Sequence, residues 1–128
     1  MRPIKFRVWH KRNKRIYKVF ELDFDADDGD PFYCGKCWGK NGRQVFFIPE
    51  EVVLMQYTGL LDKNGKEIYE GDIVEWESKE TGSPYGVHNT SRMMVEFKDQ
   101  KWTPWLSPAM EIIGNIYENQ ELLKDSHA

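Results

Sequence analysis

Apolar and polar side chains alternate along several short stretches of this chain. Residues 4–9 carry Ile, Phe and Val at every second position, with basic side chains and Trp9 between them. A second alternating stretch covers residues 16–24, where the even-numbered positions, Leu22 among them, share one face. A period of two is typical of a half-buried β-strand, and the polar residues 10–15 between the stretches are typical of a hairpin loop. We therefore expect the two stretches to form an antiparallel hairpin.

Further strands are expected wherever the same kind of alternation returns. These are residues 45–48, 52–57, 73–77, 93–97, 102–105 and 111–117. Asn64-Gly65 and residues 70–72 mark tight turns, because Asn and Gly accept the positive φ that such turns require. Residues 25–44 and 78–91 show no period and are expected to be loops.

Short strands separated by Gly and Asn turns favour a mainly β fold, in the range from β to α+β, over a sheet with crossover helices. We expect a single domain over residues 1–128, with a hairpin, a loop and connecting strands in 1–58. The order of strands and turns in 59–124 resembles a small SH3-like barrel. Asn119 is expected to cap a short C-terminal helical turn that runs through Leu123.

Four stretches of the chain are specific enough to indicate a family. They are residues 4–9, 54–60, 62–74 and 113–119, the last followed by 121–123. In order and span they resemble the YopX family over nearly the whole chain. The resemblance implies a bacteriophage or prophage protein for which self-association is expected, and it carries over no catalytic residue, cofactor or ligand. The glycines of these stretches fall where the chain turns or backbones approach closely, so we expect the stretches to specify the fold.

The composition describes a globular chain, because five Trp, six Tyr and seven Phe exceed what a disordered chain carries. The formal net charge of −3 argues against a protein dominated by neutralisation of phosphates. Basic and acidic residues are nevertheless segregated at the N-terminus. Residues 1–20 hold eight basic side chains and no acidic one, and residues 21–30 hold six acidic ones. Such blocks either neutralise each other within the fold or each face a partner.

Two surfaces are candidate binding sites. The basic N-terminal hairpin combines positive charge with a ring on which a base can stack, as in nucleic-acid-binding proteins. Its candidate residues are Arg7, Trp9, Lys11, Arg12, Lys14 and Arg15. An aromatic groove for a protein partner is the other candidate, although core packing explains the same rings. Its residues are Trp76, Tyr85, Trp102 and Trp105.

Metal binding has weaker support. Cys34 and Cys37 are spaced as half of a zinc site, and the alternatives are two free loop thiols or a redox pair. The aspartates after Leu22 are as closely spaced as those of a calcium-binding loop. However, Asp28 and Cys34 occupy the positions where an EF-hand needs Gly and Glu. The stretch from Cys34 to Cys37 is not a hallmark of the family, and the loop over 78–91 also departs from the family pattern. No phosphate-binding or catalytic motif occurs, so we expect no enzyme, no metal and no cofactor.

The leading hypothesis is a phage or prophage accessory protein that binds a host or phage protein, or itself. A nucleic-acid-binding module that uses the basic hairpin is the alternative. No apolar run approaches the roughly 20 residues of a membrane helix, and the first residues lack the apolar stretch of a signal peptide. We therefore expect the protein in the cytoplasm of a bacterial host, without membrane contact.

Overall fold

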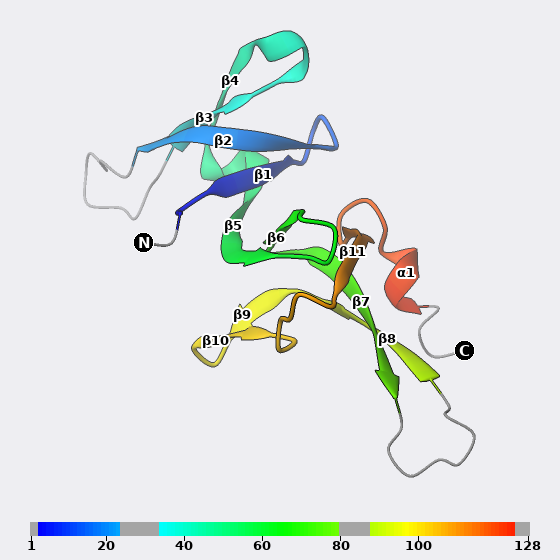
Figure 1. Cartoon of the computed structure of the whole chain (residues 1–128). Coiled ribbons are helices and arrows are strands. Elements are labelled where there is room, and N and C mark those ends of the chain that lie inside the picture. The colour runs from blue at the N-terminus through cyan, green and yellow to red at the C-terminus, as the bar shows by residue number, and fades with distance from the viewer. Residues whose placement is uncertain (1–2, 24–33, 80–87, 125–128) are drawn as a thin grey trace. The chain divides into compact units, whose positions relative to one another are not determined.

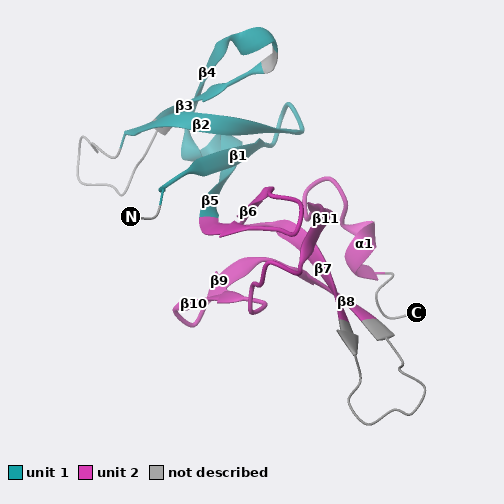
Figure 2. Ribbon diagram, viewed as in Figure 1, with its two compact units in different colours: residues 1–57 teal, residues 58–128 magenta. Residues whose placement is uncertain are grey.

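The computed structural model describes residues 3–23, 34–79 and 88–124 (Figure 1). The chain divides into two compact units, unit 1 over residues 1–57 and unit 2 over residues 58–128 (Figure 2). Each unit contains its own cluster of buried apolar side chains. Antiparallel strands predominate, and a short helix lies near the C-terminus, so the expected mainly β fold is confirmed. A closed SH3-like barrel stays a prediction.

In unit 1, β1 to β4 and the first part of β5 form a sheet in the order β4-β3-β2-β1-β5. The bounds are β1 (Phe6–His10), β2 (Arg15–Asp23), β3 (Cys34–Trp38), β4 (Gln44–Phe47) and β5 (Val52–Leu61). The last part of β5 belongs to unit 2, where β6 (Glu67–Tyr69) is its neighbour. Two 3-10 turns flank β4, η2 (Lys40–Gly42) and η3 (Pro49–Glu51). The expected N-terminal hairpin is confirmed, with Val8 opposite Tyr17 across β1 and β2. These two residues and Cys37, Phe47 and Val52 form the buried cluster on one face of the sheet.

The loop expected over residues 25–44 is wrong in its second half, where β3 and the start of β4 form. Gly35 explains why a segment without clear alternation becomes a strand. A Cβ built on Gly35 would lie 2.5 Å from the Glu21 carbonyl oxygen and 2.6 Å from Cζ of Phe47. Only glycine permits this close approach, so the pairing with neighbouring strands, and not local hydrophobic alternation, decides the conformation. Residues 25–33 lie outside the described part of the chain.

The expected face of Leu22 is also wrong. Tyr17 and Val19 lie two residues apart on β2, so both point to the face that carries the buried cluster. The pairing of β2 with β3 then shifts between Val19 and Glu21. This β-bulge inserts one unpaired residue, Phe20, and reverses the alternation beyond it. As a result Leu22 packs against the buried cluster of unit 1, and Phe20 is left on the outer face.

Unit 2 contains a three-stranded sheet in the order β11-β7-β8 and a β9-β10 hairpin. The bounds are β7 (Asp72–Lys79), β8 (His88–Met94), β9 (Glu96–Lys98), β10 (Lys101–Thr103) and β11 (Glu111–Asn115). Residues 99–100 form the turn between β9 and β10. The loop expected over 78–91 is too long, because the backbone ladder of β7 and β8 continues to the pair Lys79 and His88. Residues 80–87 lie outside the described part.

Three expected strands of unit 2 differ from the structure, and one of them is the strand expected over 102–105, which ends at Thr103 as β10. The strand expected over 93–97 is interrupted at Val95, which is buried and exchanges backbone hydrogen bonds with Gly71 and Asp72. The strand expected over 111–117 ends at Asn115. Val95 belongs to the buried cluster of unit 2, so packing sets this interruption. The other buried members of that cluster are Ile68, Val74 and Met110.

Asp62 connects the turn after β5 to β11. The residue is 4% exposed, and its Oδ1 accepts hydrogen bonds from the backbone N–H groups of Asn64 (2.8 Å) and Lys66 (2.9 Å). Its Oδ2 accepts a hydrogen bond from the N–H of Ile112 at 3.0 Å. Burial opposes the charged form, but these three hydrogen bonds and the charge of Lys66 outweigh it and hold the pKa of Asp62 below its ordinary value. One carboxylate therefore fixes two segments that lie 50 residues apart.

Polar side chains also fix the turn that follows β11. Asn115 is buried, and its Oδ1 accepts hydrogen bonds from the N–H groups of Tyr117 (3.0 Å) and Glu118 (2.9 Å). The Oδ1 of Asn119 accepts a hydrogen bond from the N–H of Asn115 at 3.2 Å. A Cβ on Gly114 would lie 2.6 Å from that Oδ1, so glycine makes room for Asn119.

The expected helical turn is confirmed as α1 (Glu121–Lys124), but the side chain of Asn119 bonds backward to Asn115. The backbone carbonyl of Asn119 accepts a hydrogen bond from the N–H of Leu122 instead. Arg92 connects α1 to the sheet, because its Nη1 donates to the Leu122 carbonyl at 3.3 Å. Its Nε forms an ion pair with Glu75 at 2.7 Å.

Asp62→Asn should lower the free energy of unfolding at neutral pH by about 1–3 kcal/mol, because an amide nitrogen cannot accept the hydrogen bond of Ile112. The carboxyl pKa is lower in the folded chain than in the unfolded chain. Its contribution is therefore complete above the unfolded value of about 3.9 and is lost as the pH falls through the folded value. Urea denaturation from neutral to acid pH should show the difference between wild type and variant shrinking below about pH 4.

Asp99→Asn is the matched control, because it removes the same charge from the exposed β9-β10 turn. It should change the free energy of unfolding by less than about 0.5 kcal/mol. Equal stability of the Asp62 variant and wild type at neutral pH would contradict the role given to this carboxylate.

Gly35→Ala should destabilise unit 1 by about 1–3 kcal/mol, because the added methyl group meets a backbone carbonyl that cannot move independently. Thermal or urea denaturation measures the change. Lys36→Ala on the same strand is the control and should have an effect below about 0.5 kcal/mol, since its ion pair with Glu21 is exposed on both sides. A Gly35 variant as stable as wild type would show that β2 and β4 separate easily at this point.

Candidate functional site

The aromatic residues expected to form a partner-binding groove have different surroundings. Trp76 and Trp102 are half-buried and pack against the buried cluster of unit 2. Trp102 also makes an edge contact with Phe97, with ring centroids 5.0 Å apart. Trp105, by contrast, is 89% exposed. Tyr85 lies outside the described residues, so within them Trp105 is the candidate whose ring is presented to solvent.

Trp105 occupies an irregular segment between β10 and β11 whose neighbouring residues are fixed. Pro104 is buried, and Leu106 packs against the buried cluster of unit 2. Leu106 also lines an apolar recess of about 210 Å³. Its other lining residues are Leu60, Leu61, Asp62, Ser107 and Pro108. The segment therefore presents a Trp ring from an anchored backbone, next in sequence to a residue that lines a recess.

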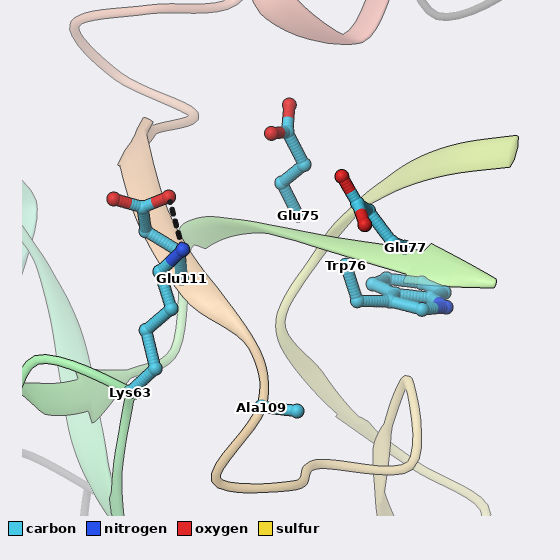
Figure 3. Close-up of a pocket in the computed structure, with 6 residues that line it drawn as sticks. All are labelled: Lys63, Glu75, Trp76, Glu77, Ala109 and Glu111. Carbon is cyan, nitrogen blue, oxygen red and sulfur yellow. Dashed lines mark ion pairs between the residues drawn. The ribbon is translucent and has the colours of Figure 1, made fainter. Parts of the chain in front are cut away.

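A second recess of about 330 Å³ lies over β7 and β11 (Figure 3). Three carboxylates line it, those of Glu75, Glu77 and Glu111, together with Lys63, Trp76 and Ala109. Figure 3 shows Glu75 and Glu77 on one side of β7 and the ring of Trp76 on the other.

Two of the three carboxylates in this recess form ion pairs. Glu111 pairs with the Nζ of Lys63 at 3.2 Å, and Glu75 pairs with Arg92. Glu75 and Glu111 are direct neighbours across β7 and β11, so each needs a cation to offset the repulsion between like charges. These pairings give Glu75 and Glu111 a structural role at the junction of the strands.

Burial sets the chemistry of Cys37. Cys37 is fully buried in unit 1, opposite Val19 and Val45, and burial raises the pKa of its thiol to about 11. A buried neutral thiol is a poor metal ligand and a poor nucleophile. Cys34 lies on the same strand, and its side chain is outside the described part. Among the described side chains, no three of His, Cys, Asp or Glu come together as metal ligands.

The candidate nucleic-acid-binding residues of the N-terminal hairpin fall into two groups. Arg7 and Trp9 lie on β1 and are half-buried. The others are exposed at the hairpin turn and at the start of β2. They are Lys11, Arg12, Lys14 and Arg15. The Nζ of Lys11 donates a hydrogen bond to the carbonyl of Glu50 at 3.3 Å, whereas Arg12, Lys14 and Arg15 extend from a turn closed by His10.

Sequence reasoning missed an exposed aromatic group on the outer face of unit 1. Phe20 and Trp38 stack with ring centroids 4.5 Å apart and are 41% and 44% exposed. Phe46 on β4 is 59% exposed. The sequence contains a signal for this group, because Gly35 and Cys37 alternate with Lys36 and Trp38 as the two faces of a strand do. The segment was expected to be a loop, so this alternation was not interpreted as a strand. The described residues include no helix with the length and apolar character needed to cross a bilayer.

Comparison with known proteins gives a family and a solved relative. The family model described as "YopX protein" matches residues 5–124. The chain is similar to a solved structure, that of protein EF1440 from Enterococcus faecalis, with 26% sequence identity and a TM-score of 0.60. That similarity covers 96% of this chain and 99% of the other. No curated protein matches significantly. Because the family model spans nearly the whole chain, the expected resemblance is confirmed, and this chain belongs to the YopX family.

Proposed function

We propose that this YopX-family protein is a bacteriophage or prophage accessory protein that acts by binding a protein partner or a second copy of itself. The exposed ring of Trp105 carries the proposal. A Trp side chain has a large apolar surface, and Trp is among the residues that contribute most binding energy at protein interfaces. A ring that is 89% exposed makes little contribution to its own fold, so burial against a partner is the use that its position favours.

The surroundings of Trp105 support an interface. Leu60 and Leu61 are 43% and 49% exposed and line the apolar recess with Leu106. An apolar recess with a few polar groups at its edge is the usual receptor for a side chain of a partner. Because Pro104 and Leu106 are held by packing, little conformational freedom of the backbone is lost when Trp105 binds.

Trp105→Ala should weaken the complex by at least about 2 kcal/mol, which is roughly a 30-fold rise in Kd. Sedimentation across a range of protein concentrations detects self-association. Affinity capture from host cytoplasm, repeated after nuclease treatment, detects other protein partners. Both readouts should fall in the variant, while its thermal stability stays close to that of wild type.

Trp38→Ala makes the same substitution in unit 1 and is the matched control, expected to leave these protein contacts unchanged. A wild-type protein that stays monomeric and captures no protein in a Trp105-dependent way would contradict the proposal. Capture that disappears after nuclease treatment would point to nucleic acid as the bridging partner.

A further inference from the structure

The outer face of unit 1 carries rings and cations side by side. Lys18 on β2 is the direct partner of Trp38 on β3, and Lys36 on β3 is the direct partner of Phe46 on β4. Directly paired residues of antiparallel strands point to the same face of the sheet. Phe20 joins them by stacking on Trp38. We call this group the aromatic–lysine face, defined by Lys18, Phe20, Lys36, Trp38 and Phe46.

The rings of the aromatic–lysine face do not form the core of unit 1. The buried cluster, with Tyr17, Cys37 and Phe47, uses the residues that alternate with them. Three large rings that are between 41% and 59% exposed therefore gather on the side of the sheet away from that cluster. Apolar groups gathered on one surface are typical of a binding site.

The charge of the two units differs in sign. Unit 1 holds eleven Lys and Arg against eight Asp and Glu, and unit 2 holds seven against thirteen. The net charge of −3 for the whole chain therefore hides a basic unit. Near the aromatic–lysine face, Lys36 pairs with Glu21 at 3.5 Å, but both side chains are about half exposed, at 43% and 53%. Such an exposed pair is weak, so a phosphate can replace Glu21 at little cost.

Exposed rings next to lysines on adjacent strands match the chemistry of single-stranded nucleic acid. Unpaired bases stack on aromatic rings, and the phosphates between them contact the cations. A duplex hides the faces of its bases, so it would use the lysines but not the rings. An acidic peptide would likewise leave the rings unused. We propose that the aromatic–lysine face of unit 1 binds single-stranded DNA or RNA, independently of the protein contacts made through Trp105.

The exposed basic residues of the hairpin extend this surface. Arg12 and Lys14 lie in the turn that joins β1 to β2, the strand that carries Lys18 and Phe20. From this turn they could contact further phosphates of a single-stranded nucleic acid that is bound across the sheet. The bases are expected at the rings, and the hairpin turn supplies additional charge.

Fluorescence anisotropy with a labelled single-stranded oligonucleotide of about 16 nucleotides tests the proposal on the full-length protein. Trp38→Ala and Phe20→Ala should each weaken binding roughly 5- to 150-fold, through loss of stacking. Trp38→Phe keeps a ring and should retain most of the affinity. Lys18→Gln should lower the slope of log K against log salt by about 0.7, the value for one phosphate contact on a single strand.

Lys101→Gln on β10 removes an exposed charge from unit 2, and Trp105→Ala removes an exposed ring there, so neither should change oligonucleotide binding. Three outcomes would overturn the proposal. The first is that the wild type shows no salt-sensitive binding. The second is that Trp38→Ala, in a folded variant, leaves binding unaffected. The third is that a duplex or a polyglutamate peptide binds as tightly as the single strand and with the same dependence on Trp38. A wild-type protein that makes no Trp105-dependent protein contact but still binds the oligonucleotide through Trp38 would reject the proposed function and leave this inference standing.

Discussion

The buried carboxylate of Asp62 is the interaction on which the arrangement of unit 2 depends. Three backbone N–H groups from two distant segments donate to it, and no neutral side chain of similar size offers two acceptor oxygens. A buried charge is tolerated only when its hydrogen bonds are complete. The cost of burying this carboxylate therefore selects the one register of the turn and of β11 in which all three donors meet it.

Similar local polar contacts recur in the stretches that indicate the family. Asp72 accepts a hydrogen bond from the N–H of Tyr69, and Asn115 fixes the turn after β11. Gly114 makes space for Asn119. These residues hold backbone groups in turns, which explains why the family stretches describe the fold and contain little chemistry for a ligand. The binding surfaces that we propose lie elsewhere, on exposed rings that contribute little to either buried cluster.

The strands that alternate locally could be predicted from the sequence, and those set by tertiary pairing could not. The hairpin of β1 and β2 and the turn at Gly65 follow from period and turn chemistry. By contrast, β3 depends on the space between Glu21 and Phe47 that Gly35 alone fits, and the bulge at Phe20 reverses the face of Leu22. Period two assigns a side chain to a face but does not say what covers that face. The exposure of Trp105 and the burial around Trp102 were therefore not predictable.

The account rests on a charged Asp62 inside a complete set of hydrogen bonds, and its titration tests this most directly. Following the ¹³C chemical shift of the Asp62 carboxyl carbon with pH reports its pKa in the folded protein. The account predicts a midpoint below the ordinary value of about 3.9, because the hydrogen bonds outweigh burial. A midpoint at or above that value would show that burial dominates, and would contradict the claim that this carboxylate holds the turn and β11 together.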